Sequence, residues 1–359
     1  MSLNKYIESF FFIALFFLSV GIFTSISITA LHHIFLLITF ILILYHLYHK
    51  RGQSFLAREF WQGLKHMPIS TWALVGILGS GILSIIFNWK LIVAVGDNPG
   101  KHIMQLKYFF FALVSVIVYQ EMGKRYSCLS QLEKDVWIKR FRWLWTLFLV
   151  ATTVATLVGI FSLYYGYNPL RMKTACHPTR NCGLYGMYMT YAYGIQFFLL
   201  LLLATILNSP KGKRYGRWLI IIFIINLIGF VLSAARGALL GFALAIPFFF
   251  VGKGEWKKFI VVICLLLGLG AGVYWGSQTG NQQLGELLTS ESRIKSQDIR
   301  YSQFLAVIEV FKQRPWLGIG FRNFEPYSSQ IKQQANISYP EFGGHAHNNF
   351  LEHLASTGI

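Results

Sequence analysis

The chain has 359 residues, of which 55% are hydrophobic and only 13% are charged, and its formal net charge is +18. Soluble domains carry about 25% charged residues, so this composition excludes an ordinary water-soluble protein. The positive charge does not indicate a nucleic-acid-binding protein, because the Lys and Arg residues cluster in short loops between apolar segments, as the orientation signals of membrane proteins do. We therefore predict an all-α fold, a polytopic transmembrane helical bundle.

Apolar segments recur along the chain, and a spanning helix needs about 20 mostly apolar residues. The first segment lacks a small-residue cleavage site, so we expect it to be a retained helix and not a signal peptide. A tenth helix is expected to begin near Asn348, with the sequence ending inside it. The predicted division is thus a transmembrane bundle (1–275), a long loop (276–347) and the start of the tenth helix (348–359). The nine predicted spans are Ile7–Ala30, Leu31–Tyr48, Pro68–Phe87, His102–Tyr119, Phe141–Leu163, Leu184–Leu207, Trp218–Leu232, Gly237–Val251 and Phe259–Trp275, the first two joined around Thr29–His33.

The loops between the spans predict the orientation. With a cytoplasmic N-terminus, four basic loops all lie on the cytoplasmic side, as the positive-inside rule expects; they are residues 49–66, 121–140, 208–217 and 252–258. The outer side then holds residues 88–101, residues 164–183, a tight turn at Ser233–Arg236, and a long segment from Gly276 to about His347 with a helical stretch near Arg300–Gln313. A loop of that length in a compact bundle is usually functional.

Two cysteines, Cys176 and Cys182, share one outer loop. An oxidising compartment would permit a disulfide there, and two free thiols are the alternative. Cys128 is predicted to face the cytoplasm, and Cys264 lies in a helix.

Two arginines on the outer side are candidates for binding a phosphate. Arg180 comes just before a helix rich in Tyr and Gly, and an interfacial arginine in an aromatic belt is the alternative interpretation. Arg236 lies between two apolar helices with almost no loop to carry it. A charge at that depth is unfavourable unless it faces the bundle interior or a wet cavity, which favours a functional role.

The third feature is the stretch GGHAHNNFLEHLASTGI, residues 343–359. Asn349 and Glu352 have the spacing of a capping box, so a helix is expected to start at Asn348 or Asn349. This places His347 at a helix entrance, where unpaired N–H groups favour an anion, and a histidine suits removal of a proton from a hydroxyl. An interfacial His345 and His347 pair is one alternative. A metal site is another, which would use both histidines with His353 or Glu341.

Together these residues favour phosphate binding combined with a general base. An arginine pair can neutralise a pyrophosphate leaving group without a metal or other cofactor. A channel or proton relay would need ionisable groups inside the spans, where Asp and Glu are nearly absent. A transporter or flippase of a lipid-linked or anionic solute stays open, although it would not explain the histidine. The GIG sequence at Gly318–Gly320 lacks the context of a dinucleotide loop.

The sequence resembles the O-antigen ligase and polymerase superfamily. The resemblance lies in SAARG (233–237), in RPWLGIGFRNF (314–324), and in a closing signature of His-Asn, nine residues and Gly that is met by His347, Asn348 and Gly358. It covers the arrangement from about Arg180 to Ile359. The family continues for about two more helices, so the last helix is expected to be only partly present.

The resemblance implies a glycosyltransferase of the bacterial inner membrane that moves a glycan from undecaprenyl pyrophosphate to an acceptor on the periplasmic face. Ligation to lipid A–core is the first choice; a polysaccharide polymerase and a protein O-oligosaccharyltransferase share these motifs. Arg236 and Arg180 would bind the donor pyrophosphate, and His347 would deprotonate the acceptor hydroxyl, which attacks with inversion. The residues that would assist substrate binding are Asn348, His345, Arg300 and Arg322, although solvated surface charges are the default interpretation for the last two.

Overall fold

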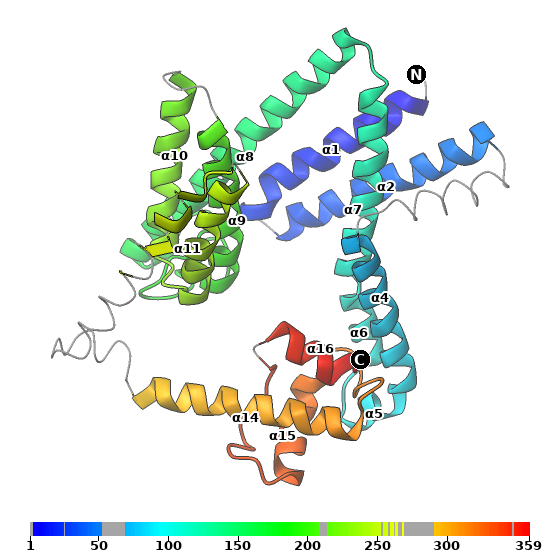
Figure 1. Ribbon diagram of the computed structural model, residues 1–359, viewed down its shortest axis with the longest axis vertical. Helices are drawn as coiled ribbons and strands as arrows, with labels where there is room; N and C mark the ends of the chain where they lie inside the picture. Colours follow the sequence, from blue (N-terminus) through cyan, green and yellow to red (C-terminus); the bar gives the residue numbers. More distant parts are fainter. Residues whose placement is uncertain are drawn as a thin grey trace. The chain divides into compact units, whose positions relative to one another are not determined.

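The computed structural model in Figure 1 describes residues 3–24, 26–51, 69–208, 214–252, parts of 254–268, 291–346 and 348–359. Within this part of the chain it contains thirteen helices and one two-stranded ribbon. Five helical segments are long and apolar enough to cross a membrane, which confirms the predicted helical membrane protein; they are Leu3–Thr24, Ile28–His49, Pro99–Ser127, Gln131–Tyr165 and Tyr188–Asn208. Three other predicted spans correspond to shorter apolar helices, Thr71–Phe87, Tyr215–Val231 and Arg236–Phe248.

Several predicted features lie outside the described residues. They are His347, most of the span Phe259–Trp275, most of the basic loop at 49–66, the middle of the loop at 208–217, and residues 276–290 of the long outer segment.

The chain forms two compact units. The first comprises Met1–Ile43 and Glu121–Gly272, and the second comprises Leu44–Gln120 and Val273–Ile359. The predicted division at residues 275 and 347 stays a prediction.

In the first unit, α1 (Leu3–Thr24) packs on α8 (Gln131–Tyr165), and α10 (Arg214–Val231) packs on both α8 and α9 (Tyr188–Asn208). Helix α11 (Arg236–Val251) packs on α9. The core between them is aromatic and aliphatic, with Phe23, Leu149, Tyr191, Phe198 and Phe230 among its buried residues. Between α8 and α9 the chain forms a hairpin of β1 (Tyr167–Asn168) and antiparallel β2 (Lys173–Thr174).

Two boundaries in this unit differ from the prediction. Helix α1 ends at Thr24 and α2 (Ile26–Arg51) begins at Ile26, so the predicted junction at Thr29–His33 lies within α2. The backbones pass so closely there that a Cβ on Gly21 would lie 2.7 Å from the amide nitrogen of Thr29, so α2 is already helical where a turn was expected.

The predicted cytoplasmic loop at 121–140 is almost entirely helical. Helix α7 (Lys107–Ser127) and α8 are separated only by Cys128–Ser130, and Ser130 with Glu133 forms a capping box that starts α8. With 35 residues, α8 is about 52 Å long, which exceeds the roughly 30 Å hydrocarbon core of a bilayer. The Lys, Glu and Gln residues of this segment are good helix formers, so they extend the helices beyond the apolar stretch.

The second unit is built from α4 (Ile69–Phe87), α5 (Trp89–Ala94), α6 (Pro99–Gln105), α14 (Glu291–Gln313), α15 (Phe324–Gln334) and α16 (Asn349–Thr357). Helix α14 contacts α15 and α16, and α16 contacts α4. The described part of the long outer segment is therefore an ordered helical unit. Helix α14 begins nine residues before the predicted stretch at Arg300, and α15 was not predicted, although its buried residues Phe324, Ser328, Ile331 and Lys332 follow a helical period.

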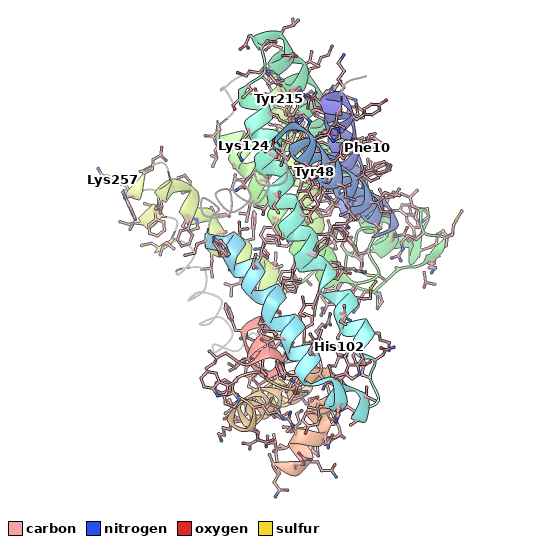
Figure 2. The ribbon with its side chains drawn as sticks, turned by 90° about the vertical axis from the view of Figure 1, so that its right-hand side faces the viewer. Phe10, Tyr48, His102, Lys124, Tyr215 and Lys257 are labelled. Carbon is pink, nitrogen blue, oxygen red and sulfur yellow. A yellow bond between two sulfur atoms is a disulfide. The ribbon has the colours of Figure 1, made fainter. Side chains whose placement is uncertain are left out.

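His102, labelled in Figure 2, joins α6 to the outer segment. Its Nδ1 lies 2.5 Å from the carbonyl oxygen of Phe321, and its Nε2 lies 3.1 Å from Oδ2 of Asp97. The ring is 3% exposed. This contact ties the N-terminal and C-terminal portions of the second unit together beside α16.

Candidate functional site

Asn348 is the N-cap of α16. Its extended backbone (φ −146°, ψ 120°) lets Oδ1 accept hydrogen bonds from the N–H groups of Phe350 at 2.9 Å and Leu351 at 3.2 Å, as an N-cap residue should. The helix thus starts where it was predicted. The capping box predicted for Asn349 and Glu352 is wrong, however, because the cap is one residue earlier.

Glu352 has a different partner from the one predicted. Its Oε2 accepts a hydrogen bond from the backbone N–H of Ala346 at 2.8 Å. Ala346 is fully buried, so this bond satisfies a donor that water does not reach. Although His347 lies outside the described residues, the residue before it is bonded to Glu352 and the residue after it caps α16.

The GIG sequence binds the other end of α16. The N–H groups of Ile319 and Gly320 donate to the carbonyls of Ala355 and Ser356, at 3.0 and 3.1 Å. These are carbonyls that a helix C-terminus leaves unpaired. Gly318 has φ +57°, and a Cβ there would lie 2.3 Å from the carbonyl oxygen of Ala355. Glycine is required at this position, for a structural reason unrelated to nucleotides.

Helix α16 ends at Thr357 instead of continuing to the last residue. Gly358 has φ +71°, and the N–H of Ile359 donates to the carbonyl of Pro315 at 2.8 Å. A left-handed glycine cannot continue a right-handed helix, which corrects the expectation of a helix running through Ile359.

The approach to His345 and Ala346 is held by α14 and α15. Lys332 is fully buried, and its Nζ donates to the carbonyl of Phe342 at 2.9 Å, a carbonyl that also accepts from Nε2 of Gln303 at 2.9 Å. Burial lowers the pKa of Lys332, and Glu341 opposes that shift. The N–H of Gly344 donates to Oγ of Ser328 at 2.9 Å. The segment leading to the predicted base is therefore fixed by side chains from two helices.

A cavity of about 610 Å³ lies beside the N-terminus of α16. Its polar wall carries a cation, a carboxylate, an imidazole and an amide, namely Arg322, Glu352, His345 and Asn348. Its aromatic wall is a cluster of Phe109, Phe321 and His353, whose ring centroids lie 6.1 to 6.3 Å apart. A cavity of this size with a few polar groups among apolar walls is typical of a small-molecule site.

The predicted substrate-binding residues of this unit have different surroundings. Arg322, for which a solvated surface charge was the default interpretation, is exposed, lines the cavity and has a positive φ of 59°. His345 lines it too, with Nδ1 3.8 Å from Oε1 of Glu325. Arg300 is exposed on α14 and is not among the cavity residues.

Arg180 belongs to the first unit, where it is half-buried. Its guanidinium carbon lies 4.3 Å above the centre of the Tyr188 ring at the start of α9. The N–H of Asn181 donates to the carbonyl of Leu232 at 2.9 Å. Cys176 and Cys182 are bridged, so the disulfide is present in place of the two free thiols. Together these contacts fix the loop that carries Arg180 against the end of α10.

Arg236 is the first residue of α11 and is exposed, after the tight turn that was predicted. Ser233 is fully buried in this turn, and Ala234 has φ +51°. A helix N-terminus attracts anions through its unpaired N–H groups and its dipole. Because Asn181 bonds Leu232, the loop of Arg180 is anchored four residues before Arg236 in the sequence. The predicted arginine pair is thus brought to one region of the first unit.

His347, the predicted base, falls in the sequence range of the second unit, as do Asn348, His345 and Arg322. Convergence of both units on one substrate stays a prediction. Among the described residues, no group of three or more His, Cys, Asp and Glu side chains is arranged to hold a metal. Sequence reasoning missed Glu352 and Phe109 as members of the cavity, and only the spacing of Glu352 from Asn349 hinted at the first.

Residues 221–359 match the family model described as O-antigen ligase. The chain carries an O-antigen ligase domain. No curated protein and no solved structure matches the chain. The O-antigen ligase domain runs from within α10 to the end of the described chain. It contains Arg236, the predicted His347 and the cavity residues from Phe321 onward, while Arg180 and the cavity residues Ile77, Gln105, Tyr108 and Phe109 precede it. The family of O-antigen ligases and polymerases implies a membrane enzyme of the glycosyltransferase type that acts on lipid-linked glycans.

Proposed function

We propose that this protein transfers a glycan from undecaprenyl pyrophosphate to an acceptor hydroxyl on the periplasmic face of the bacterial inner membrane. The acceptor proposed first is lipid A–core, which makes the protein an O-antigen ligase. The reaction is proposed to invert the anomeric centre and to use neither a metal nor a nucleotide sugar. A polymerase or a protein O-oligosaccharyltransferase would use the same donor with a different acceptor.

The observation that carries this proposal is the environment of the α16 N-terminus within the O-antigen ligase domain. Both chain neighbours of His347 are anchored to α16, through Asn348 and through the bond from Ala346 to Glu352. A catalytic base must be held in place because misplacement by about 1 Å can lower the rate about 100-fold. The adjacent cavity supplies room for a sugar.

In the proposed reaction, His347 accepts the proton of the acceptor hydroxyl while the hydroxyl oxygen attacks the anomeric carbon of the donor glycan. The bond between that carbon and the pyrophosphate oxygen breaks, and undecaprenyl pyrophosphate leaves with the bonding electron pair. Arg236 and Arg180 stabilise the negative charge of the leaving group, as arginines do for phosphates. The position of Arg236 at the N-terminus of α11 supports this role, because a helix N-terminus favours an anion.

The cavity is proposed to hold the sugar next to the base. A sugar ring has an apolar C–H face and a rim of hydroxyl groups, which fits one aromatic wall and one polar wall. Phe109 and Phe321 would pack against the C–H face, while Arg322, His345 and Asn348 would hydrogen-bond hydroxyls. Arg300 stays a candidate for contacting a longer glycan.

The test is His347→Ala, with His49→Ala as a control histidine that lies on α2 and is exposed. Purified variants are assayed for transfer of a lipid-linked glycan, and cells are assayed for surface polysaccharide. A general base contributes about 100- to 10,000-fold to a rate, so we expect transfer to fall at least about 100-fold in the first variant only. Unchanged surface polysaccharide together with impaired export of the substrate would contradict the enzyme and favour a transporter instead.

A second experiment separates a ligase from a polymerase. The gene is expressed in strains with different lipid A–core acceptors, and the size ladder of the surface glycan is compared. A ligase changes where the glycan is attached, whereas a polymerase changes its length.

A further inference from the structure

The outer segment between α8 and α9 is an ordered loop. Its hairpin is closed by the N–H of Ala175, which donates to the carbonyl of Gly166 at 2.8 Å. Within the turn, the N–H of Arg171 donates to Oδ1 of the buried Asn168 at 3.1 Å. The Cys176–Cys182 disulfide then joins the end of β2 to the segment that leads into α9. The side chains of this loop are thus displayed on a fixed backbone.

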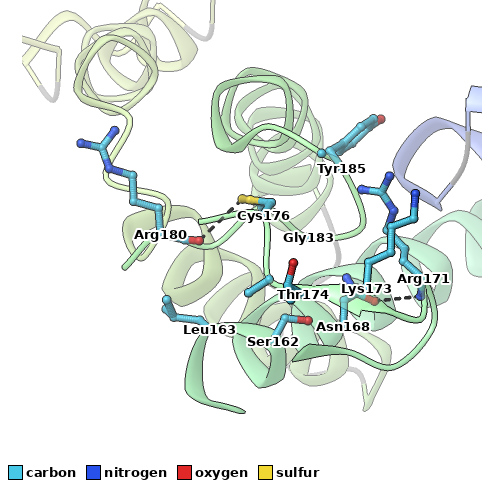
Figure 3. Close-up of a pocket in the computed structure, with 14 residues that line it drawn as sticks. Ser162, Leu163, Asn168, Arg171, Lys173, Thr174, Cys176, Arg180, Gly183 and Tyr185 are labelled. Atoms are coloured by element: carbon cyan, nitrogen blue, oxygen red, sulfur yellow. Dashed lines mark hydrogen bonds between the residues drawn. A yellow bond between two sulfur atoms is a disulfide. The ribbon is translucent and has the colours of Figure 1, made fainter. Parts of the chain in front are cut away.

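Two cations of this loop lie next to each other. Figure 3 shows Arg171 and Lys173 side by side and pointing the same way, whereas the guanidinium of Arg180 points to the other side of the loop. The Arg171 guanidinium lies beside Gly186, where a Cβ would be at an ordinary contact distance of 3.6 Å from Nη1. All three cationic residues line a cavity of about 290 Å³.

Nothing in this region neutralises the pair. The sequence has no Asp or Glu between Asp135 and Glu255. Among the described residues, neither the Arg171 guanidinium nor the Lys173 ammonium has an ion-pair partner. Two cations side by side repel each other, so an anion bound between them would be favoured.

Exposed apolar side chains lie at the end of α8 and in the turn of this hairpin. Tyr164, Tyr165, Leu170 and Met172 are each between 61% and 82% exposed. Tyrosines concentrate at the boundary between the hydrocarbon core and the headgroups. Apolar side chains that enter a bilayer beside a cationic face are typical of segments that lie in the interface. The anion within reach of such a loop is a phosphate in the headgroup layer.

From these observations we propose that the disulfide-closed hairpin forms a phosphate-binding site in which Arg171 and Lys173 hold one phosphate group at the membrane surface. The site is additional to the Arg180 and Arg236 pair, because its two cations point to the opposite side of the loop from Arg180. It does not depend on glycan transfer. Its ligand is a phosphate carried by an anionic lipid headgroup or present as a free phosphate ester.

The experiment uses the full chain purified in a neutral detergent, with its thermal unfolding midpoint as the readout, since a ligand that binds only the folded state raises the midpoint with its concentration. One arm titrates sodium phosphate at constant ionic strength. The other adds mixed micelles of phosphatidylglycerol, with phosphatidylcholine as the neutral reference. The variant is Arg171→Gln with Lys173→Gln. The matched control is Lys139→Gln with Arg142→Gln, which removes the same two charges from exposed positions of α8.

We expect the apparent affinity of the wild-type chain for at least one probe to weaken about tenfold or more in the Arg171 and Lys173 variant and to be kept in the control. A response to phosphatidylglycerol alone identifies a lipid headgroup as the source, and a response to sodium phosphate shows that the phosphate group suffices. Equal responses of wild type and variant would overturn the proposal, as would an equal loss in the control. His347→Ala should keep the phosphate response, so loss of transfer and loss of this site are read separately.

Discussion

The bond between Glu352 and Ala346 gives the sharpest prediction for catalysis. Glu352→Ala removes the acceptor of a buried N–H that immediately precedes His347. Hydrogen bonds to charged groups contribute about 1.5–3 kcal/mol. If this energy holds the imidazole in its reactive position, its loss lowers the rate about 10- to 100-fold. Because the defect is one of positioning, it should appear in kcat more than in KM.

The conservative variant separates positioning from charge. Glu352→Gln keeps an oxygen that can accept the N–H of Ala346, so its kcat should stay within about threefold of wild type. Glu309→Ala removes a carboxylate from α14 in the same unit and serves as the control. Its partners there are two exposed side chains of the same helix, Lys312 and Gln313. Initial rates of glycan transfer are measured over a range of acceptor concentrations, and the unfolding midpoint of each variant is recorded.

Two results would refute this reasoning. If Glu352→Ala keeps kcat within about threefold of wild type, the bond does not position the base. If Glu352→Gln loses as much activity as Glu352→Ala while remaining folded, the negative charge is needed and the hydrogen bond alone is not.

Two further predictions concern stability. Gly318→Ala introduces a Cβ 2.3 Å from a backbone oxygen at φ +57°, so the free energy of unfolding should fall by more than about 2 kcal/mol. Gly76 in α4 has open space around it, so Gly76→Ala should change the free energy of unfolding by less than about 1 kcal/mol. Equal effects of the two variants in denaturant melts would contradict the packing described. The pKa of Asp97 is lowered, most by the hydrogen bond from the N–H of Asn98 and less by His102 and Lys101. The contribution of Asp97 to folding stability is therefore present above about pH 3.9 and is lost as the pH falls through the folded-state pKa. Asp97→Asn should therefore lower the unfolding midpoint at pH 7 and approach wild type in acid, and a difference that stays constant with pH would count against this assignment.

The sequence by itself determined the membrane class, most of the helices and the placement of the candidate residues at helix ends. These properties depend on local patterns. Apolar runs predict spans, and the start of α16 followed from an asparagine and a glutamate a few residues apart. The turn before Arg236 was visible because almost no polar residues separate two apolar stretches. The closing His347-Asn348 signature also indicated the family, which the match over residues 221–359 bears out.

Tertiary structure decided what surrounds those residues. GIG is local in sequence, but its partners are the carbonyls of Ala355 and Ser356, more than thirty residues later. Likewise, Arg322 lines the cavity only because the outer segment folds back onto α16 and α4. Hydrogen bonds and packing between distant segments leave no periodic signal in a single sequence, because each partner satisfies local rules equally well in other arrangements. The environment of the proposed base was therefore readable only from the folded chain.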